Sequence, residues 1–360
     1  TIDTGARSEV KASLAINSPE LWSPDCPTLY DLYIQLLSPS GQQLDSIQSY
    51  TGLREISILD GKLCLNQQPL YIKGLLDQGY FPEGWYTPLD DAAMIRDIEL
   101  VQAMGFNLVR KHQKAEDPRF LYWADRKGLM VWSEMPSGRI FCADLIEQLP
   151  LEWLQLMRRA QPHPCVICWV PFNESWGVWH QRSRSQQRAF VDATVALTKS
   201  MDSSRPVIGN DGWEYSSGDL FTLHLYDNSA SQLIAKLREL IANPQAHLSS
   251  SEQARPAALP GADPSGLPLV LSECGGIGYV NVTTTDELFA YGDLPETPAA
   301  LSEKIQELAN ALTQIDELQG FVWTQLTDIQ QEINGLLYFD RTPKLPLDQI
   351  KALFDVTGDT

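Results

Sequence analysis

The sequence predicts an α/β protein whose main part is a (β/α)8 TIM barrel, preceded by a partial β-sandwich. From about residue 59 onward, short apolar runs alternate with amphipathic segments in eight β/α steps. The residues before this point carry a strand-like alternation instead. The chain has 360 residues, of which 43% are hydrophobic, and this is enough for a large buried core. We therefore divide it into a sandwich region, residues 1–58, and a barrel, residues 59–360.

The sandwich region has the two-residue period of exposed strands. Apolar and polar side chains alternate over residues 32–36, a Ser-Pro-Ser-Gly turn follows at 38–41, and further short strands are expected at 46–50 and 56–58. So few strands cannot close a core by themselves. We therefore expect the chain to be a fragment that begins within a domain.

The barrel region alternates strands with helices. A helix is expected between Asp90 and Gly105, and another between Pro118 and Gly128, because these residues are typical of helix ends. Three more helices are expected where residues 190, 193 and 197, residues 233, 237 and 240, and residues 301, 305, 308 and 312 share a face. The expected strands are 71–74, 106–110, 129–132, 166–172, 207–210, 220–225, 267–273 and 320–323.

Two features refine this fold. Residues 243–267 are rich in Pro, Ala, Ser and Gly, which predicts an exposed loop rather than core. The competing fold is a doubly wound open sheet. It is disfavoured because it usually has fewer strands and because no Gly-rich phosphate turn follows the first strand. The barrel is therefore the preferred architecture.

The charge and the cysteines limit the function classes. A net charge of −19 disfavours binding to nucleic acid or to a membrane surface. The six cysteines are scattered, and Cys165 and Cys168 fall within a strand, where positions three apart face opposite sides. We therefore expect no metal, no cofactor and free thiols. Free thiols favour a cytoplasmic location, and we expect the native N-terminus to be missing from the chain. A homo-oligomer is compatible with the sequence.

Two carboxylates follow the fourth and seventh expected strands of the barrel. Barrel enzymes carry their reactive groups where the strands end at the C-terminal face, so Glu174 and Glu273 are expected to face each other across the barrel mouth. Such a pair suits the cleavage of a glycosidic bond, in which one carboxyl group protonates the leaving oxygen and the other attacks. The alternative is a pair of ordinary loop carboxylates or strand-end ion pairs.

Four ordered motifs resemble glycoside hydrolase family 2. The segment 169–177 (WVPFNESWG), preceded by His163-Pro164, resembles the acid/base motif of that family, and 270–276 (VLSECGG) resembles its nucleophile motif. Residues 321–328 (FVWTQLTD), followed by Gln331-Glu332 and Asn334-Gly335, resemble the end of its barrel. Leu21 to Pro24 and Leu29-Tyr30 resemble the preceding immunoglobulin-like sandwich, and Gly52 to Arg54 and Leu65-Asn66 resemble its junction with the barrel.

The resemblance implies a retaining exo-β-glycosidase similar to β-galactosidases and β-glucuronidases. It implies Glu174 as acid/base and Glu273 as nucleophile, with Asn173 bound to the sugar 2-hydroxyl. The other side chains that it implies near the substrate are Arg110, His112, His224, Tyr226 and, as an aromatic floor beneath the sugar, Trp323.

Two further candidates come from their positions at strand ends. Asp77 follows the first barrel strand, and Trp213 follows the fifth, where a binding role and a packing role are equally open. Glu134 also ends a strand, but a structural ion pair is the preferred interpretation.

The motifs do not separate a galactoside, which is favoured, from a glucuronide or a mannoside. Two other classes of protein remain as alternatives. A noncatalytic carbohydrate-binding barrel would not need both glutamates. A metal-dependent hydrolase would need more strand-end ligands than His112 and His224 offer.

Overall fold

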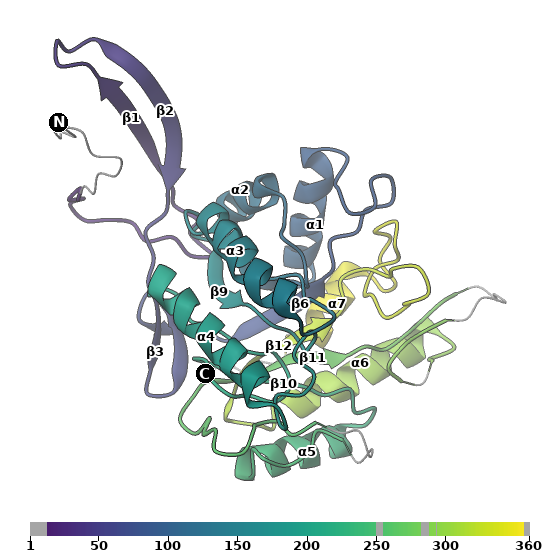
Figure 1. Ribbon diagram of the computed structural model, residues 1–360. Helices are drawn as coiled ribbons and strands as arrows, with labels where there is room; N and C mark the ends of the chain where they lie inside the picture. Colours follow the sequence, from purple (N-terminus) through teal and green to yellow (C-terminus); the bar gives the residue numbers. More distant parts are fainter. Residues whose placement is uncertain (1–12, 250–254, 282–287, 293, 356–360) are drawn as a thin grey trace.

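The computed structural model describes residues 13–249, 255–281, 288–292 and 294–355. Its centre is a parallel sheet in the strand order β10-β11-β12-β6-β7-β8-β9, so that the first barrel strand lies beside the last (Figure 1). This is the expected barrel arrangement. The strands are β6 (Ile72–Asp77), β7 (Leu108–Lys111), β8 (Met130–Glu134), β9 (Val166–Val170), β10 (Phe221–His224), β11 (Leu269–Gly275) and β12 (Leu318–Thr324).

The fifth barrel position is irregular. Residues 207–211 pair with the β9 side through isolated parallel bridges, Trp169 to Val207 and Asn173 to Asp211, so the expected strand 207–210 is not a regular strand. The chain folds back after it, and Ile208 forms an antiparallel bridge with Gly218. A Cβ on Gly209 would lie 2.1 Å from the carbonyl oxygen of Ser217, so only glycine permits this close return.

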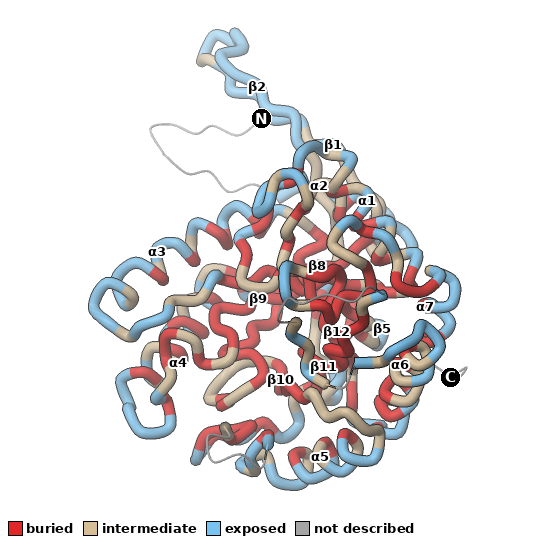
Figure 2. Tube along the Cα trace, turned by 90° about the vertical axis from the view of Figure 1, so that its right-hand side faces the viewer, coloured by how far each residue is buried: buried red, intermediate tan, exposed pale blue. Residues whose placement is uncertain are grey.

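Seven helices of the described chain surround the sheet, and Figure 2 shows their inner sides buried and their outer sides exposed. The first begins after Asp90, whose carboxylate accepts from the N–H of Ala93, and the second ends at Gly128 with φ of 75°. Both ends agree with the sequence prediction. The helices are α1 (Asp91–Ala103), α2 (Pro118–Lys127), α3 (Ala143–Ala160), α4 (Ser185–Met201), α5 (Ala230–Ala242), α6 (Pro298–Leu312) and α7 (Leu347–Leu353).

Helix α4 buries a different face from the one expected. Ala193 is exposed, whereas Thr194 and Thr198 are buried. Each threonine hydroxyl donates to the carbonyl four residues earlier, at 2.8 and 2.7 Å, and this satisfies its polar group within the helix. The buried stripe therefore contains residues that an apolar pattern does not count. Helices α3 and α7 were not predicted.

The segment 243–267 is partly core rather than an exposed loop. Ala257 and Leu259 are buried, and the backbone of Tyr215 bonds to both of them at 2.8 and 2.9 Å. The small side chains that suggested a loop allow this close backbone packing. Residues 257–259 thereby pack beside Tyr215, close to the irregular fifth barrel position.

The N-terminal part is antiparallel, consistent with part of an immunoglobulin-like domain. Strands β1 (Tyr30–Leu37) and β2 (Gln43–Thr51) form a ribbon that projects from the barrel (Figure 1). A three-stranded sheet of β3 (Ile56–Leu59), β4 (Lys62–Leu65) and β5 (Gln68–Pro69) follows. The predicted division of the chain after residue 58 falls within β3 and stays a prediction. Among the described residues, no helix has the length and apolar character needed to cross a bilayer.

Candidate active site

Glu174 lies just beyond β9, on a backbone turn in the left-handed region. Its φ is 48° and that of Ser175 is 58°, and two hydrogen bonds hold this turn. The Glu174 N–H donates to the carbonyl of Asp211 at 3.0 Å, and the Ser175 N–H donates to Oδ1 of Asn210 at 2.9 Å. Residues 210 and 211, at the irregular fifth barrel position, therefore hold the backbone that carries the Glu174 carboxylate after β9.

A buried hydroxyl completes the support of this turn. Ser175 Oγ donates to Glu214 Oε2 at 2.5 Å and accepts from Gln181 and Asn210, both at 3.1 Å. Glu214 in turn pairs with Arg255 at 3.2 Å. The backbone beneath Glu174 is thus tied, through Glu214, to Arg255.

Glu273 lies in β11 with its carboxylate close to that of Glu174. A carboxylate oxygen of each residue and one ring nitrogen of His224 all lie within 4.8 Å of one another. Arg110 Nη1 donates to Glu273 Oε1 at 2.9 Å, and the hydroxyl of Tyr226 donates to Oε2 at 2.5 Å. Each oxygen of the Glu273 carboxyl group therefore accepts a hydrogen bond.

Arg110 is the central cation of the site and is fully buried in β7. Its guanidinium contacts Glu134 at 2.7 Å, Asp211 at 2.6 Å and Glu273 at 2.9 Å. Burial lowers the pKa of Arg110, but these carboxylates outweigh burial and raise the pKa well above its ordinary value. The planar guanidinium can serve several carboxylates at once, which the point charge of lysine does not.

His224 ends β10 and contacts both glutamates. Its Nδ1 lies 2.8 Å from Glu174 Oε1 and 3.4 Å from Glu273 Oε1, and its Nε2 lies 3.0 Å from Asp211 Oδ2. Burial lowers the pKa of His224, but the charges of Glu273 and Asp211 outweigh burial and raise it to about 10. The ring is therefore an imidazolium at neutral pH.

Asn173 and His112 are held by Arg110. Asn173 Oδ1 accepts from Nη2 at 2.6 Å, and His112 Nδ1 lies 3.3 Å from the same nitrogen. His112 Nδ1 is also 3.2 Å from Glu134, whose charge raises the pKa of His112 against the opposing effect of burial. Glu134 thus forms the ion pair that the sequence analysis preferred.

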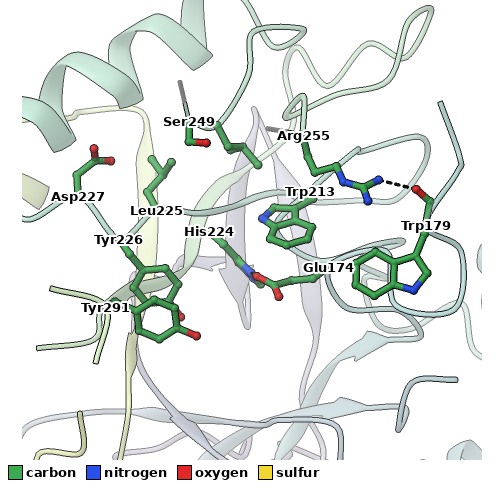
Figure 3. Close-up of a pocket in the computed structure, with 11 residues that line it drawn as sticks. Glu174, Trp179, Trp213, His224, Leu225, Tyr226, Asp227, Ser249, Arg255 and Tyr291 are labelled. Atoms are coloured by element: carbon green, nitrogen blue, oxygen red, sulfur yellow. Dashed lines mark hydrogen bonds and ion pairs between the residues drawn. The ribbon is translucent and has the colours of Figure 1, made fainter. Parts of the chain in front are cut away.

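A cavity of about 600 Å³ opens above Glu174 and His224 (Figure 3). One side holds Trp213 and Trp179 with Arg255 beside them, and the other holds Tyr226 and Tyr291. The two tyrosine rings are stacked, with their centroids 3.6 Å apart. The remaining lining residues are Leu225, Asp227, Leu248 and Ser249.

Six candidates from the sequence lie outside this cavity lining, and four of them, Glu273, Arg110, His112 and Asn173, form the contacts around Arg110 described above. The other two, Asp77 and Trp323, have different partners. Asp77 pairs with Lys111 at 2.5 Å and accepts from the N–H of Gly79. Trp323 is 1% exposed, and its ring packs against Phe354 with centroids 5.0 Å apart. The substrate contacts predicted for these two residues stay predictions, because the structure engages both side chains elsewhere.

Three residues of the site were missed. Asp211 is buried between Arg110 and His224, which hold its pKa below the ordinary value in spite of burial. It follows the expected fifth strand, so the strand-end rule could have found it. Arg255 and Tyr291 follow segments with no regular pattern, and nothing in the local sequence marks them.

The cluster of Glu174, His224 and Glu273 is also the one group of the described residues with the spacing of metal ligands. A metal needs the lone pair of a neutral imidazole. The nitrogen of His224 that faces the two glutamates instead carries a proton, because the pKa of the ring is about 10. A cation bound here would therefore have to displace that proton.

Comparison with known proteins places the chain in a family. The model described as "Glycosyl hydrolases family 2, TIM barrel domain" matches residues 56–255, and "Glycosyl hydrolases family 2" matches residues 1–54. A β-galactosidase of Vibrio cholerae is 29% identical over 363 residues, which cover 95% of this chain and 32% of that protein. The β-galactosidase 2 of Enterobacter cloacae is 33% identical over 207 residues, which cover 54% of this chain and 19% of that protein.

Solved structures give the same fold. A family 2 β-galacturonidase of Eisenbergiella tayi, bound to galacturonate, has a TM-score of 0.77 at 19% identity over 97% of this chain and 62% of that one. The β-D-glucuronidase of Dictyoglomus thermophilum has a TM-score of 0.76 at 20% identity, over 96% of this chain and 60% of that one. The chain spans about a third of the length of the Vibrio relative. Since the barrel model alone matches more than half of the chain, the protein belongs to glycoside hydrolase family 2.

Proposed function

We propose that this chain is the catalytic part of an exo-β-glycosidase that cleaves with retention of configuration. The observation that carries the proposal is the approach of a Glu174 oxygen to within 4.8 Å of a Glu273 oxygen. Retaining enzymes hold their two carboxyl groups about 5–5.5 Å apart, whereas inverting enzymes leave about 6.5–9.5 Å for a water molecule. The geometry supports direct attack by a carboxylate.

In the first step Glu273 is the nucleophile and Glu174 is the acid. The carboxylate of Glu273 bonds to the anomeric carbon, the bond from that carbon to the leaving oxygen breaks, and the proton of Glu174 passes to this oxygen. Arg110 and Tyr226 support this assignment, because both donate hydrogen bonds to the carboxyl group of Glu273 and hold it in place. Glu174 lines the cavity, where an aglycone would leave.

In the second step Glu174 is the base. It takes a proton from a water molecule, whose oxygen attacks the anomeric carbon and releases Glu273. Asn173 would bind the sugar 2-hydroxyl through its amide N–H, because its Oδ1 already accepts from Arg110. The bond strengthens as positive charge develops on the sugar.

The charges of the cavity favour a neutral sugar over a uronate. Among the described lining residues, the cations Arg255 and His224 are already paired, Arg255 with Glu214 and His224 with Glu174. A uronate would also meet the carboxyl group of Asp227 in the same cavity. A galactoside is favoured because the curated relatives named above are β-galactosidases.

A panel of aryl β-glycosides tests this proposal. The chain is expected to release nitrophenol from the β-galactoside at least tenfold faster, in kcat/KM, than from the β-glucuronide or the β-mannoside, because an unpaired carboxylate is costly to desolvate. The variant Asp227→Asn should narrow the ratio of galactoside to glucuronide. A preference for the glucuronide would contradict the assignment of the sugar. Binding without turnover of any glycoside would favour a noncatalytic carbohydrate-binding barrel.

The variant Glu174→Ala tests the acid/base role. Substrates with poor leaving groups should slow by about 10²–10⁴-fold, the usual contribution of a general acid, while a dinitrophenyl glycoside should slow much less in its first step. Azide should restore turnover and give the β-glycosyl azide, since Glu273 still forms the intermediate. The kinetic measurement is kcat/KM against the pKa of the leaving phenol. A uniform loss across the series would remove Glu174 from this role.

A further inference from the structure

The ring of His224 is held at both nitrogens and is packed against Gly212. It is 1% exposed, and Gly212 packs against it so closely that a Cβ there would lie 2.2 Å from ring carbon Cγ. Its Nδ1 faces Glu174 and Glu273, while its Nε2 faces Asp211. Asp211 is itself fixed, because its Oδ1 accepts from Ser272 at 2.7 Å. The ring is therefore rigidly placed between carboxylates.

When Glu174 and Asp211 are both ionised, these contacts need a proton on each ring nitrogen. A neutral imidazole has a single N–H, so it could donate to Glu174 or to Asp211 but not to both. The charged groups around the ring come from four elements: Glu174 beyond β9, Asp211 at the fifth position, Glu273 in β11 and Arg110 in β7, whose Nη1 is 3.2 Å from Nε2. Three carboxylates against one guanidinium favour the charged ring.

We propose that His224 is a charged bridge between the acid and the nucleophile, and that it sets the pH range of turnover by stabilising the ionised forms of both glutamates. This role rests on the proposed function and goes beyond it, because His224 acts through Glu174 and Glu273 rather than on the sugar. It is a positioning residue. Its Nδ1 lies 2.8 Å from Glu174 Oε1, and this is the contact through which it acts on the acid.

The bridge acts in opposite ways on the two states of Glu174. An adjacent cation lowers the pKa of a carboxyl group, so the bridge disfavours the protonated acid that the first step needs. It also stabilises the negative charge that develops on Glu174 as the proton leaves, and it holds the ionised base that the second step needs. Because the first step requires ionised Glu273 and protonated Glu174, the bridge moves both limbs of its pH profile to lower pH.

The variant His224→Asn tests the bridge, because an asparagine amide can still donate near the position of Nδ1 but carries no charge. In the pH profile of kcat/KM, both limbs should move upward by about one unit or more. His163→Asn is the matched control. His163 pairs with Asp125 at 2.6 Å, and neither residue lines the cavity. The control should leave both limbs unchanged, and an unchanged profile in His224→Asn would overturn the proposal.

A second readout does not depend on turnover. In ¹⁵N NMR spectra of the intact chain, one imidazole should stay charged to about pH 10, and its signal should be missing from folded His224→Asn. Titration of His224 near its ordinary value would overturn the bridge, whatever the activity. If the pKa of His224 is high but no glycoside is cleaved, the charged ring is supported and the proposed function is refuted. A melting curve of each variant is the check that the variant is folded.

Discussion

The variant Glu273→Ala is expected to lose turnover of an aryl β-galactoside by on the order of 10⁴-fold or more, as enzymes do when their nucleophile is removed. The physical reason is that no covalent intermediate can form, so neither half of the double displacement remains. Arg110 and Tyr226 would also lose their shared partner, while Arg110 would keep its ion pairs with Glu134 and Asp211. The measurement is kcat by nitrophenol release together with the configuration of the product.

Added azide separates this loss from simple damage to the fold. In Glu273→Ala, azide can attack the anomeric carbon only from the vacated side and should give an α-glycosyl azide, the inverted product. Glu303→Ala is the matched control, because Glu303 is an exposed glutamate on α6, away from the barrel mouth. It should keep the activity of the original chain. A β-configured azide product from Glu273→Ala would rule out Glu273 as the nucleophile.

The variant Arg110→Met is expected to lower the free energy of unfolding by about 3–5 kcal/mol at neutral pH, the usual cost of removing one partner from a buried ion pair. It leaves the carboxylates of Glu134, Asp211 and Glu273 without the cation that they share. Urea unfolding measured by tryptophan fluorescence checks this value. Turnover should fall with it, because Asn173 and Glu273 both lose a hydrogen bond from the guanidinium.

The loss of unfolding free energy in Arg110→Met should depend on pH. The pKa values of Asp211 and Glu134 are lowered in the folded protein, so these residues add stability above about pH 4, the ordinary range for carboxyl groups, and lose it as the pH falls. Without Arg110 this contribution disappears. The difference from the original chain should therefore be largest at neutral pH and shrink below about pH 4. Arg110→Lys keeps a charge and should recover part of the stability, and a difference independent of pH would contradict this account.

Much of the barrel was predictable because its elements repeat simple signals. Asp90 and Gly128 mark helix ends by chemistry that acts locally, and the apolar runs of the parallel strands stand out because both faces are buried. The fifth position was not predictable in detail, because its bridges depend on the return of the chain at Gly218. The buried threonines of α4 were missed because an apolar pattern does not record hydrogen bonds made inside a helix.

The site was predictable where the strand-end rule applies and less so elsewhere. Glu174, Glu273, His224 and Arg110 all end or follow barrel strands, and the structure brings them together. The rule does not tell which face of a strand a side chain occupies. For Trp323, whose ring packs against Phe354, the predicted contact with the sugar stays a prediction. The partners of Glu174 from the irregular segments required three-dimensional coordinates.

Glu174 and Ser175 both have left-handed backbone conformations, and this short stretch implies a trade-off between stability and the proposed activity. Residues other than glycine pay an energetic penalty in this conformation, and the surrounding network has to maintain it. Exchanging Ser175 for glycine would relieve the penalty, but it would also remove the hydroxyl that links the acid to Glu214. Selection for thermal stability alone would thus favour loss of the arrangement that the proposed turnover needs, and stabilising substitutions are better sought in the outer helices of this protein.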